Sequence, residues 1–451
     1  MNTMWMTLSE TVLIECEQSA DEGRDVKGFL DEASLILENF RAGQLREEDA
    51  KRLIGRIRNA PVSRDYPYHE PSGLEEIRAA RPKARGGEDA RKPARDAYYD
   101  KVYGAWLGRC AGCLLGQPVE GWYSQRILGM LKDTGNYPVG KYLASNVGEE
   151  TRKKYRITDE GHVYGSNQIN WINNVSCMPE DDDTNYTILY LKILETYGRG
   201  FTSENVAEGW LMNVPIYHVC TAERVAYMNL VNRVLPPLSG SYYNAYREWI
   251  GAQIRADFFG YINPGDTETA AEYAWRDARI SHVKNGIYGE MFAAAMIARA
   301  AVSGDVRDVI ERGLGEIPEK SRLAEGVQKV LGWHEEGASW EDALSKIHAV
   351  YNEKNPHHWC HTISNAMICT AALLWGGGDL EKTIGISVCA GFDTDCNAAT
   401  TGSIAGVMAG ASALSEKWIR PLNNRVKSGI DGFGLTEISE LAERTVVQAF
   451  K

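Results

Sequence analysis

Apolar residues recur every three to four positions along most of the chain, and this is the spacing of an amphipathic α-helix. The alternation of apolar and polar residues that is typical of strands is scarce. We therefore expect a mostly α-helical protein. The segments with helical spacing are residues 29–40, 49–57, 97–116, 183–195, 206–212, 222–231, 245–259, 267–278, 286–302, 322–332, 340–351, 363–375 and 435–450.

The pattern changes twice near the N-terminus. Residues 1–60 carry two helical segments and predict a small N-terminal helical extension. Residues 61–95 are rich in Pro, Gly, Arg and Asp, which is typical of an extended linker, or of a strap that lies over the next domain. From residue 96 the helical pattern resumes, so we expect the main domain to comprise residues 96–451.

Two segments place glycines at intervals of four. Residues four apart share one face of a helix, and a face without side chains lets another helix approach closely. We expect the two faces to pack against each other in the core, because Asp100, Lys101 and Arg109 argue against a membrane helix. The glycines are Gly104, Gly108, Gly112 and Gly116 in the first segment and Gly402, Gly406 and Gly410 in the second.

Two groups of carboxylates stand at the start of helical segments. Asp393 and Asp395 precede the second glycine face, and Asp181, Asp182 and Asp183 precede the helix that begins near residue 183. One or two of these acids could simply cap a helix or lie in a surface turn. Five acids exceed what capping needs, and oxygen ligands suit Mg²⁺, Mn²⁺ or Ca²⁺. The sequence therefore predicts a site for two divalent cations.

Other candidate side chains occur where loops meet helices. Glu120 and Trp122 follow Pro118, which ends the first glycine-faced helix, so Glu120 should reach the same end of the core as the aspartates. An exposed loop acid is the alternative for Glu120. The further candidates for contact with a substrate are Arg255, His282, Asn285, Tyr288, His361 and Asn365. Histidines packed in the core and asparagines that cap helices are the alternatives for this set.

Composition excludes several classes of protein. The chain of 451 residues is 44% apolar and has a formal net charge of −12, with no dense block of Lys or Arg. Nucleic acid and anionic membranes are therefore not expected partners. No apolar run is long enough to span a membrane, and the N-terminus lacks the basic region of a secretory signal. The nine scattered cysteines indicate reduced thiols, so we expect a cytoplasmic protein.

Cys110 and Cys113 form a C-x-x-C pair. A structural zinc ion would need two more ligands, and these could come from His357, His358, Cys360 and His361. Small thiols inside a glycine-rich helix more often serve as packing residues. We therefore favour packing for this pair.

Three motifs, in this order, resemble the ADP-ribosylglycohydrolase family, which includes the dinitrogenase reductase-activating glycohydrolase. They are residues 104–120, the run Asp182-Asp183-Thr184, and residues 391–410. The resemblance covers about residues 96–451. It implies an all-α fold, a compact orthogonal helix bundle, with two Mg²⁺ or Mn²⁺ ions between the acidic loops. It also implies cleavage of the glycosidic bond at C1 of ADP-ribose.

The resemblance assigns roles residue by residue. The catalytic residues that it implies are Glu120, Asp182 and Asp395. The metal ligands that it implies are Asp182, Asp183, Asp393 and Asp395, and we add Asp181, which adjoins the first motif and can compensate for the loss of a ligand at Cys396, to complete the expected set. Arg255 and His282 match the Arg of the middle phosphate-loop region and the His of the next helix. The full set of expected substrate-binding residues is Trp122, Arg255, His282, Asn285, Tyr288, His361 and Asn365.

Several positions depart from the family pattern. Asp181 and Cys396 stand where Thr is usual, Cys113 where an Asp is usual and Phe392 where a Gly is usual. The middle loop is shortened to residues 251–253. The cation site is retained in this pattern, whereas the loop that holds a diphosphate is remodelled.

We therefore expect a metal-dependent hydrolase that cleaves an N- or O-glycosidic bond at C1 of a ribosyl group. The substrate would be a ribosyl or ADP-ribosyl compound, either small or attached to a protein. The sequence leaves the oligomeric state open, with a monomer favoured over an oligomer. One alternative is a binding module that holds ADP-ribose or a nucleotide without cleaving it. Cys113 and Cys396, which replace residues of the family pattern, would favour this alternative. Another is a structural all-α protein whose acids bind Ca²⁺.

Overall fold

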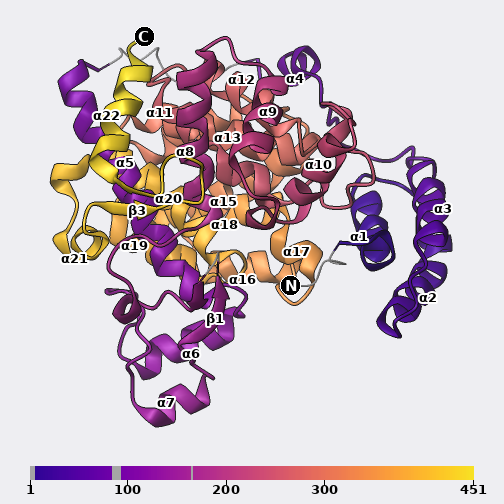
Figure 1. Ribbon diagram of the computed structural model, residues 1–451, viewed down its shortest axis with the longest axis horizontal. Helices are drawn as coiled ribbons and strands as arrows, with labels where there is room; N and C mark the ends of the chain where they lie inside the picture. Colours follow the sequence, from indigo (N-terminus) through magenta and orange to yellow (C-terminus); the bar gives the residue numbers. More distant parts are fainter. Residues whose placement is uncertain (1–5, 84–92, 164–165) are drawn as a thin grey trace.

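The computed structural model describes residues 6–83, 93–163 and 166–451. It is built almost entirely of helices (Figure 1), so the predicted all-α fold class is confirmed. The strands form two antiparallel two-stranded sheets, β1 (Glu160–Val163) with β2 (Ser166–Gln168) and β3 (Arg425–Lys427) with β4 (Leu435–Glu437). In the described part of the chain, every helix is too short or too polar to cross a lipid bilayer.

The first three helices lie within the predicted N-terminal extension. They are α1 (Leu8–Asp21), α2 (Leu30–Arg41) and α3 (Glu47–Arg58). In Figure 1 α2 and α3 stand at the right edge, and α1 lies between them and the main body. The extension has a small apolar core of its own, which includes Val12, Ile36 and Leu53. Helices α2 and α3, which carry the amphipathic spacing of residues 29–40 and 49–57, therefore bury their apolar faces against α1.

The main body holds one large apolar core. Its first half comprises α4 (Leu74–Ala80), α5 (Arg95–Gly116), α6 (Ser124–Asp133), α7 (Glu149–Lys154), α8 (Asp182–Tyr197), α9 (Ser203–Asn213), α10 (Thr221–Val231), α11 (Asp257–Tyr261), α12 (Thr267–Ala278) and α13 (Lys284–Ala300). Its second half comprises α14 (Val306–Leu314), α15 (Arg322–Glu335), α16 (Trp340–Val350), α17 (Pro356–Cys360), α18 (Thr362–Gly376), α19 (Leu380–Cys389), α20 (Thr394–Ala409), α21 (Glu416–Ile419) and α22 (Ile438–Ala449).

Helices α5 and α20 pack backbone to backbone at the centre of the main body. A methyl group added at Gly108 or Gly112 would overlap main-chain atoms of Gly402 or Ala398. In the other direction, a methyl group at Gly406 would overlap the carbonyl of Gly104. The predicted contact between the two glycine faces is therefore confirmed. Both helices are buried, so this contact fixes the position of the end of α5 relative to the start of α20. Glu120 follows the first of these ends, and Asp393 and Asp395 lie at the second.

The prediction of one helix over residues 245–259 was wrong. The chain instead forms a 3₁₀ helix at Ile250–Arg255 and then α11. Gly251 lies directly against the carboxyl group of Glu223, and Arg255 is held by buried acids, so tertiary contacts impose the tighter turn. Residues 435–437 form β4, so the last predicted helix begins only at Ile438.

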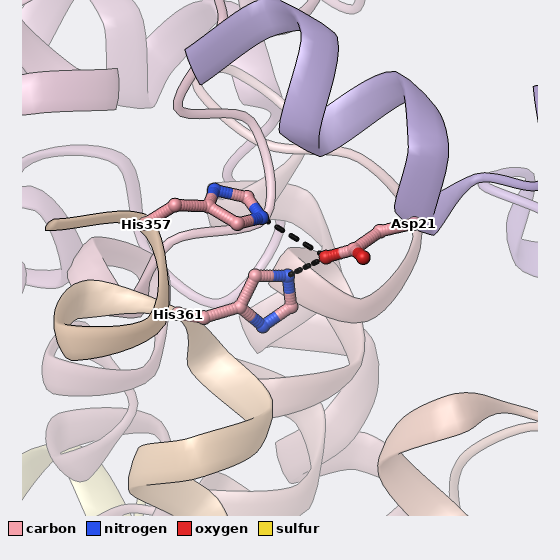
Figure 2. A group of neighbouring side chains, drawn as sticks. All are labelled: Asp21, His357 and His361. Carbon is pink, nitrogen blue, oxygen red and sulfur yellow. Dashed lines mark hydrogen bonds and ion pairs between the residues drawn. The ribbon is translucent and has the colours of Figure 1, made fainter. Parts of the chain in front are cut away.

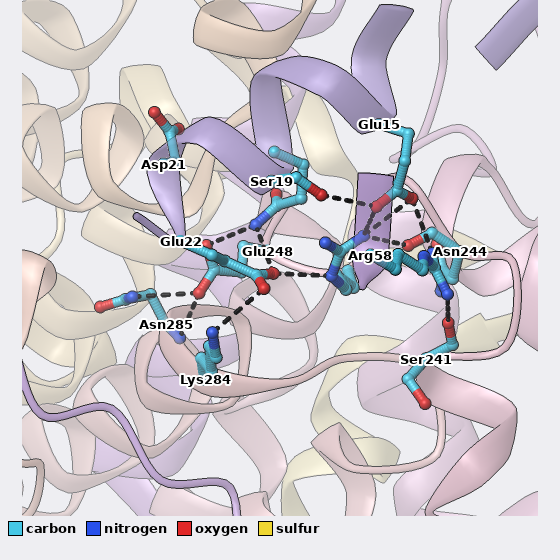
Figure 3. Close-up of polar contacts among 12 residues, drawn as sticks. Glu15, Ser19, Asp21, Glu22, Arg58, Ser241, Asn244, Glu248, Lys284 and Asn285 are labelled. Carbon is cyan, nitrogen blue, oxygen red and sulfur yellow. Dashed lines mark hydrogen bonds and ion pairs between the residues drawn. The ribbon is translucent and has the colours of Figure 1, made fainter. Parts of the chain in front are cut away.

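A buried polar network joins the extension to the main body (Figure 3). Glu15 accepts hydrogen bonds from Arg58 at 2.7 Å and from Arg247 at 3.0 Å. Glu22 forms ion pairs with Arg247 at 2.7 Å and with Lys284 at 3.1 Å. These contacts hold α1 against the loop that precedes the 3₁₀ helix. The segment after α3 crosses the main body and contains α4, and residues 84–92 of the predicted linker lie outside the described residues.

Candidate functional site

Carboxylates from three distant parts of the chain converge at one end of the α5–α20 pair. The hydroxyl of Thr394 donates a hydrogen bond of 2.9 Å to the carbonyl of Gly116, which joins the end of α5 to the start of α20. Potential ligand atoms of Glu120, Asp393 and Asp395 consequently lie within 4.8 Å of one another. Glu120 is exposed, whereas both aspartates are buried.

The start of α8 supplies the second acidic group. A main-chain bridge between Met178 and β3 anchors the segment before this helix. Asp181 is the N-cap residue of α8, and its carboxylate accepts a hydrogen bond of 3.0 Å from the amide of Asp183. Asp181 also accepts from the side-chain amide of Gln117 at the end of α5. It is therefore both a helix cap and a member of the acidic cluster. Burial, and after it the negative charge of Asp181, raises the pKa of the neighbouring Cys113 thiol well above its usual value.

Potential ligand atoms of Asp183 lie close to those of two other acids. One group is Cys113, Asp181 and Asp183, and another is Asp183, Asp395 and Cys396, each with ligand atoms within 4.8 Å. Asp183 therefore connects the start of α8 to the start of α20. The proximity expected for the two acidic motifs is present in the structure.

Arg109 is a central residue of the site that sequence reasoning missed. Its guanidinium group is fully buried and lies 3.2 Å from the carboxylate of Asp183 and 2.7 Å from that of Asp257. It also donates a hydrogen bond of 2.8 Å to the main-chain carbonyl of Asp183. The signal in the sequence was an arginine next to Gly108 within an apolar helix, since a buried arginine needs acidic partners.

The buried carboxylates retain unused hydrogen-bonding capacity. In the described structure, Oδ2 of Asp183, Oδ1 of Asp393 and Oδ1 of Asp395 are buried and have no hydrogen-bond partner. Burial and the neighbouring charges raise the pKa of Asp393, and burial raises that of Asp395 to about 6. The negative charge of Asp395 is the main cause of a raised pKa at Glu120. Unpaired oxygens that repel one another are the donors that a divalent cation would neutralise, so these residues fit a cation site.

An unusual turn presents Asp393 to this cluster. Gly391 and Phe392 both have left-handed backbone angles, with φ of +71° and +55°. This conformation costs a non-glycine residue about 1 kcal/mol or more. Phe392 is fully buried and its ring lies 5.0 Å from that of His348, so packing holds the turn.

The expected substrate-binding residues fall into three places. Trp122 adjoins the acidic cluster, because it lies on the same loop as Glu120. The guanidinium of Arg126 lies 3.3 Å from the ring centroid of Trp122, and the ring of Trp171 packs edge-on at a centroid distance of 6.2 Å.

Asn365 is buried and accepts a hydrogen bond of 2.7 Å from Asn397 of α20.

Arg255 and His282 lie inside the fold. Arg255 donates to Asp277 at 2.6 Å and to Glu223, and its guanidinium stacks over Trp210 at 5.0 Å. His282 is buried, and burial holds its pKa well below the usual value. The structure gives both residues internal partners, and their contact with a substrate stays a prediction.

Asn285, Tyr288 and His361 lie beneath the extension and the segment that follows it. Asn285 donates to Glu70 at 2.8 Å, and the hydroxyl of Tyr288 donates to the carbonyl of Pro71. These side chains are thus occupied by residues outside the expected main domain. Their role in substrate binding also stays a prediction.

His357 and His361 meet Asp21 of α1 in a second cluster of metal-capable side chains (Figure 2). The indole N–H of Trp249 donates to Nδ1 of His357 at 3.0 Å, and the amide of Ile363 donates to Nδ1 of His361 at 3.1 Å. Both Nδ1 atoms are therefore acceptors, which places the proton of each neutral ring on Nε2. The Nε2 atoms lie 2.9 Å and 3.9 Å from Asp21.

This tautomer assignment decides what the second cluster is. A histidine that binds a metal through Nε2 normally donates from its other nitrogen, which neither ring can do here. The cluster is consequently a structural contact, in which a hydrogen bond of 2.9 Å from Nε2 of His357 to Asp21 fastens α1 to α17. Among the described residues, no group of three metal-capable side chains unites the Cys110 and Cys113 pair with a histidine, so the structure gives no support to the zinc alternative.

Comparison with known proteins agrees with the motif pattern. A family model described as ADP-ribosylglycohydrolase matches residues 94–451. A curated protein of Archaeoglobus fulgidus, described as uncharacterized, is 24% identical over 331 residues, which is 72% of this chain and 92% of that protein. A solved structure titled "ADP-ribosylglycohydrolase-related protein complex" aligns with a TM-score of 0.43 and 17% identity, over 79% of this chain and 99% of that one.

Proposed function

The chain belongs to the ADP-ribosylglycohydrolase family, and from this premise we propose that it is a cation-dependent hydrolase of ribosyl compounds. Family membership supports a glycohydrolase-type activity. The observation that carries the finer proposal is the convergence of Glu120, Asp183, Asp393 and Asp395, with buried oxygens that have no partner in the described structure. The bond cleaved would be an N- or O-glycosidic bond at C1 of a ribose.

The proposed roles follow from position and charge. Asp181, Asp182, Asp183, Asp393 and Asp395 would hold two Mg²⁺ or Mn²⁺ ions. Such ions, when bound, orient hydroxyl groups and lower the pKa of water. Glu120 would accept a proton from a water molecule that approaches C1, and its exposure within its group supports this role. The buried carboxylates would stabilise the positive charge that develops on the sugar during cleavage.

The substrate class is the ribosyl or ADP-ribosyl group, either in a small compound or attached to a protein. Trp122 is the aromatic side chain next to Glu120 and is proposed to pack against the substrate. Arg126 already covers one face of its ring, so only the remaining surface is available.

A turnover screen tests this proposal. The full chain, freed of metal with a chelator, is incubated with ADP-ribosylated protein and with small ribosyl compounds, before and after addition of Mg²⁺ or Mn²⁺. We expect release of the ribosyl product only after metal is restored. Equal turnover in the presence of excess chelator would contradict the cation-dependent reaction.

A binding module is the second candidate, and the thiols of Cys113 and Cys396 inside the acidic cluster favour it, since sulfur is a poor ligand for Mg²⁺. Calorimetric titration with ADP-ribose separates the candidates. Tight binding, without product from any ribosyl substrate at any metal concentration, would favour the module over the hydrolase.

A further inference from the structure

Two cysteine side chains belong to the acidic cluster. Cys113 projects from α5 and is fully buried, and its sulfur lies within 4.8 Å of ligand atoms of Asp181 and Asp183. Cys396 lies in the first turn of α20 and is 7% exposed, and its sulfur lies within 4.8 Å of ligand atoms of Asp183 and Asp395. Both sulfurs therefore adjoin Asp183.

The third group of ligand atoms contains only oxygen. It comprises Glu120, Asp393 and Asp395, and its first member is exposed. The cluster thus has an outer part with carboxylates alone and an inner part in which two thiols accompany carboxylates. The close packing of α5 on α20 holds the two thiol-bearing helices at a fixed separation.

Charge and hydrogen bonding leave the inner part able to accept an ion. Arg109 contacts Oδ1 of Asp183, whereas Oδ2 of Asp183 is buried and has no hydrogen-bond partner in the described structure. Oδ1 of Asp395 is likewise buried without a partner. These buried oxygens are a second observation beside the positions of the thiols, and they are acceptors that a bound cation would contact.

The two parts differ in the ions that they suit. Carboxylate oxygens alone suit Mg²⁺ or Mn²⁺, whereas thiolate sulfur selects Zn²⁺, Fe²⁺ or Co²⁺. Cys110 offers an internal comparison, because it lies one turn from Cys113 on the same buried helix and belongs to no group of metal-capable side chains among the described residues. Packing alone explains Cys110, but it does not explain why two other thiols gather around Asp183.

We propose that the cation positions of this site are chemically unequal: an outer one of oxygen ligands alone, and an inner one at Asp183, where Cys113 and Cys396 stand in separate groups of ligand atoms and one or both thiols join the aspartates and select a thiolate-binding divalent transition ion. The inference rests on the cation pair of the proposed function, and it replaces the inner Mg²⁺ or Mn²⁺ ion of that pair by such a transition ion. On binding, each ligating sulfur gives its proton to solvent and its electron pair to the ion, with no change of oxidation state.

Titration of the full-length, metal-free protein with Co²⁺ tests whether one cation position contains thiolate ligands. Cobalt bound by thiolate shows a charge-transfer absorption band that cobalt bound by oxygen lacks. We expect this band in the wild-type protein and in Cys110→Ser. In Cys113→Ser and Cys396→Ser the band should weaken, and in the double variant it should disappear. Circular dichroism confirms that each variant is folded.

Calorimetry supplies a second measurement. Cys396→Ser should weaken Zn²⁺ binding at least about tenfold and leave Mg²⁺ binding within about twofold of wild type, because only the inner position uses sulfur. Wild-type protein that shows no thiolate band with Co²⁺ would overturn the inference, whatever the variants do.

The outcome is separable from that of the proposed function. Ribosyl hydrolysis with Mg²⁺ and no thiolate–cobalt band would remove the inference and leave the hydrolase standing. A thiolate–cobalt band that depends on Cys396, in a protein that turns over no ribosyl compound, would support the inference and remove the hydrolase.

Discussion

Arg109 sets the charge balance of the acidic cluster. A fully buried guanidinium that faces Asp183 and Asp257 neutralises part of a site whose other members are carboxylates. Burial alone would lower the pKa of Arg109, and the two aspartates outweigh it, so the group stays charged. Arg109 therefore helps the cluster to hold negative charge in the core.

Replacement of Arg109 by Met should lower the free energy of unfolding by about 3–5 kcal/mol, because it leaves two buried carboxylates without their cation. Urea denaturation measures the change. Arg307→Met, which removes a partly exposed arginine paired with Glu311 at 2.7 Å and with Glu335, is the control and should cost less than about 1 kcal/mol. Equal losses in the two variants would refute the assigned role of Arg109.

Asp395→Asn and Asp182→Asn should each lower ribosyl hydrolysis at least about 100-fold, because a stabilisation of several kcal/mol by bound cations depends on their charge. The amide keeps the shape of the carboxylate, so the circular dichroism should match wild type. Asp431→Asn, at an exposed residue paired with Lys192, serves as control and should retain full activity. Wild-type rates in both cluster variants would remove the two-cation site.

The sequence allowed the acids to be found, but not their partner. Asp182, Asp183, Asp393 and Asp395 stand in short local motifs, and their clustering follows from the glycine-faced helices. Arg109 meets Asp183 across 74 residues of chain, and such a contact leaves no local pattern. The same holds for Gln117, whose amide donates to Asp181.

At the scale of elements, the α5–α20 pair is the feature that positions the site. Glycines at intervals of four predicted both buried helices and their mutual contact, because only a bare face permits backbone contact. The 3₁₀ helix at Ile250–Arg255 escaped prediction, because its apolar spacing fits an α-helix and only the buried acids around Arg255 impose the tighter turn. Periodicity thus reveals a helix face but not the tertiary contacts that reshape it.

Gly112→Ala should cost about 1–3 kcal/mol or more of stability, because the added methyl group would overlap the main chain of Ala398. Gly332→Ala in α15, where no atom lies within 4 Å of the added carbon, should be neutral or stabilise by up to about 1 kcal/mol. Thermal and urea denaturation of both variants make the comparison. A neutral Gly112→Ala would mean that the two helices are not in contact.

At the scale of the whole molecule, the N-terminal extension is fastened to the main body by buried ions. Glu248 accepts from Gln18 of α1 at 2.7 Å and pairs with Arg322 at 2.7 Å. Burial opposes ionisation of Glu248, but Arg322 and His361 outweigh it and hold its pKa well below the usual value. The same balance applies to Asp21. Burial would raise its pKa, but the hydrogen bond from His357 and the neighbouring charges outweigh burial, so the pKa of Asp21 is lowered.

This charge pattern predicts a pH dependence. A carboxylate whose pKa is lowered by folding adds stability above its ordinary pKa, here 4.5 for Glu248, and that stability is lost as the pH falls through the lower folded value. Glu248→Gln should therefore cost about 3 kcal/mol at pH 7, and the difference from wild type should shrink steadily below about pH 4. Urea midpoints between pH 3 and pH 8 measure it.

The exposed Glu48 provides the control, and Glu48→Gln should change stability by less than about 0.5 kcal/mol at any pH. A cost for Glu248→Gln that stays constant down to pH 3 would contradict the proposed ion pairing.

The bare faces of α5 and α20 also govern how the protein fails on heating. The main chains of α5 and α20 are in direct contact there, so rearrangement of side chains cannot separate the two helices gradually. The carboxylates at the ends of these helices keep their separation until the two helices part, and that parting opens the centre of the main body. Loss of catalysis and loss of helical structure should accordingly follow one and the same melting curve.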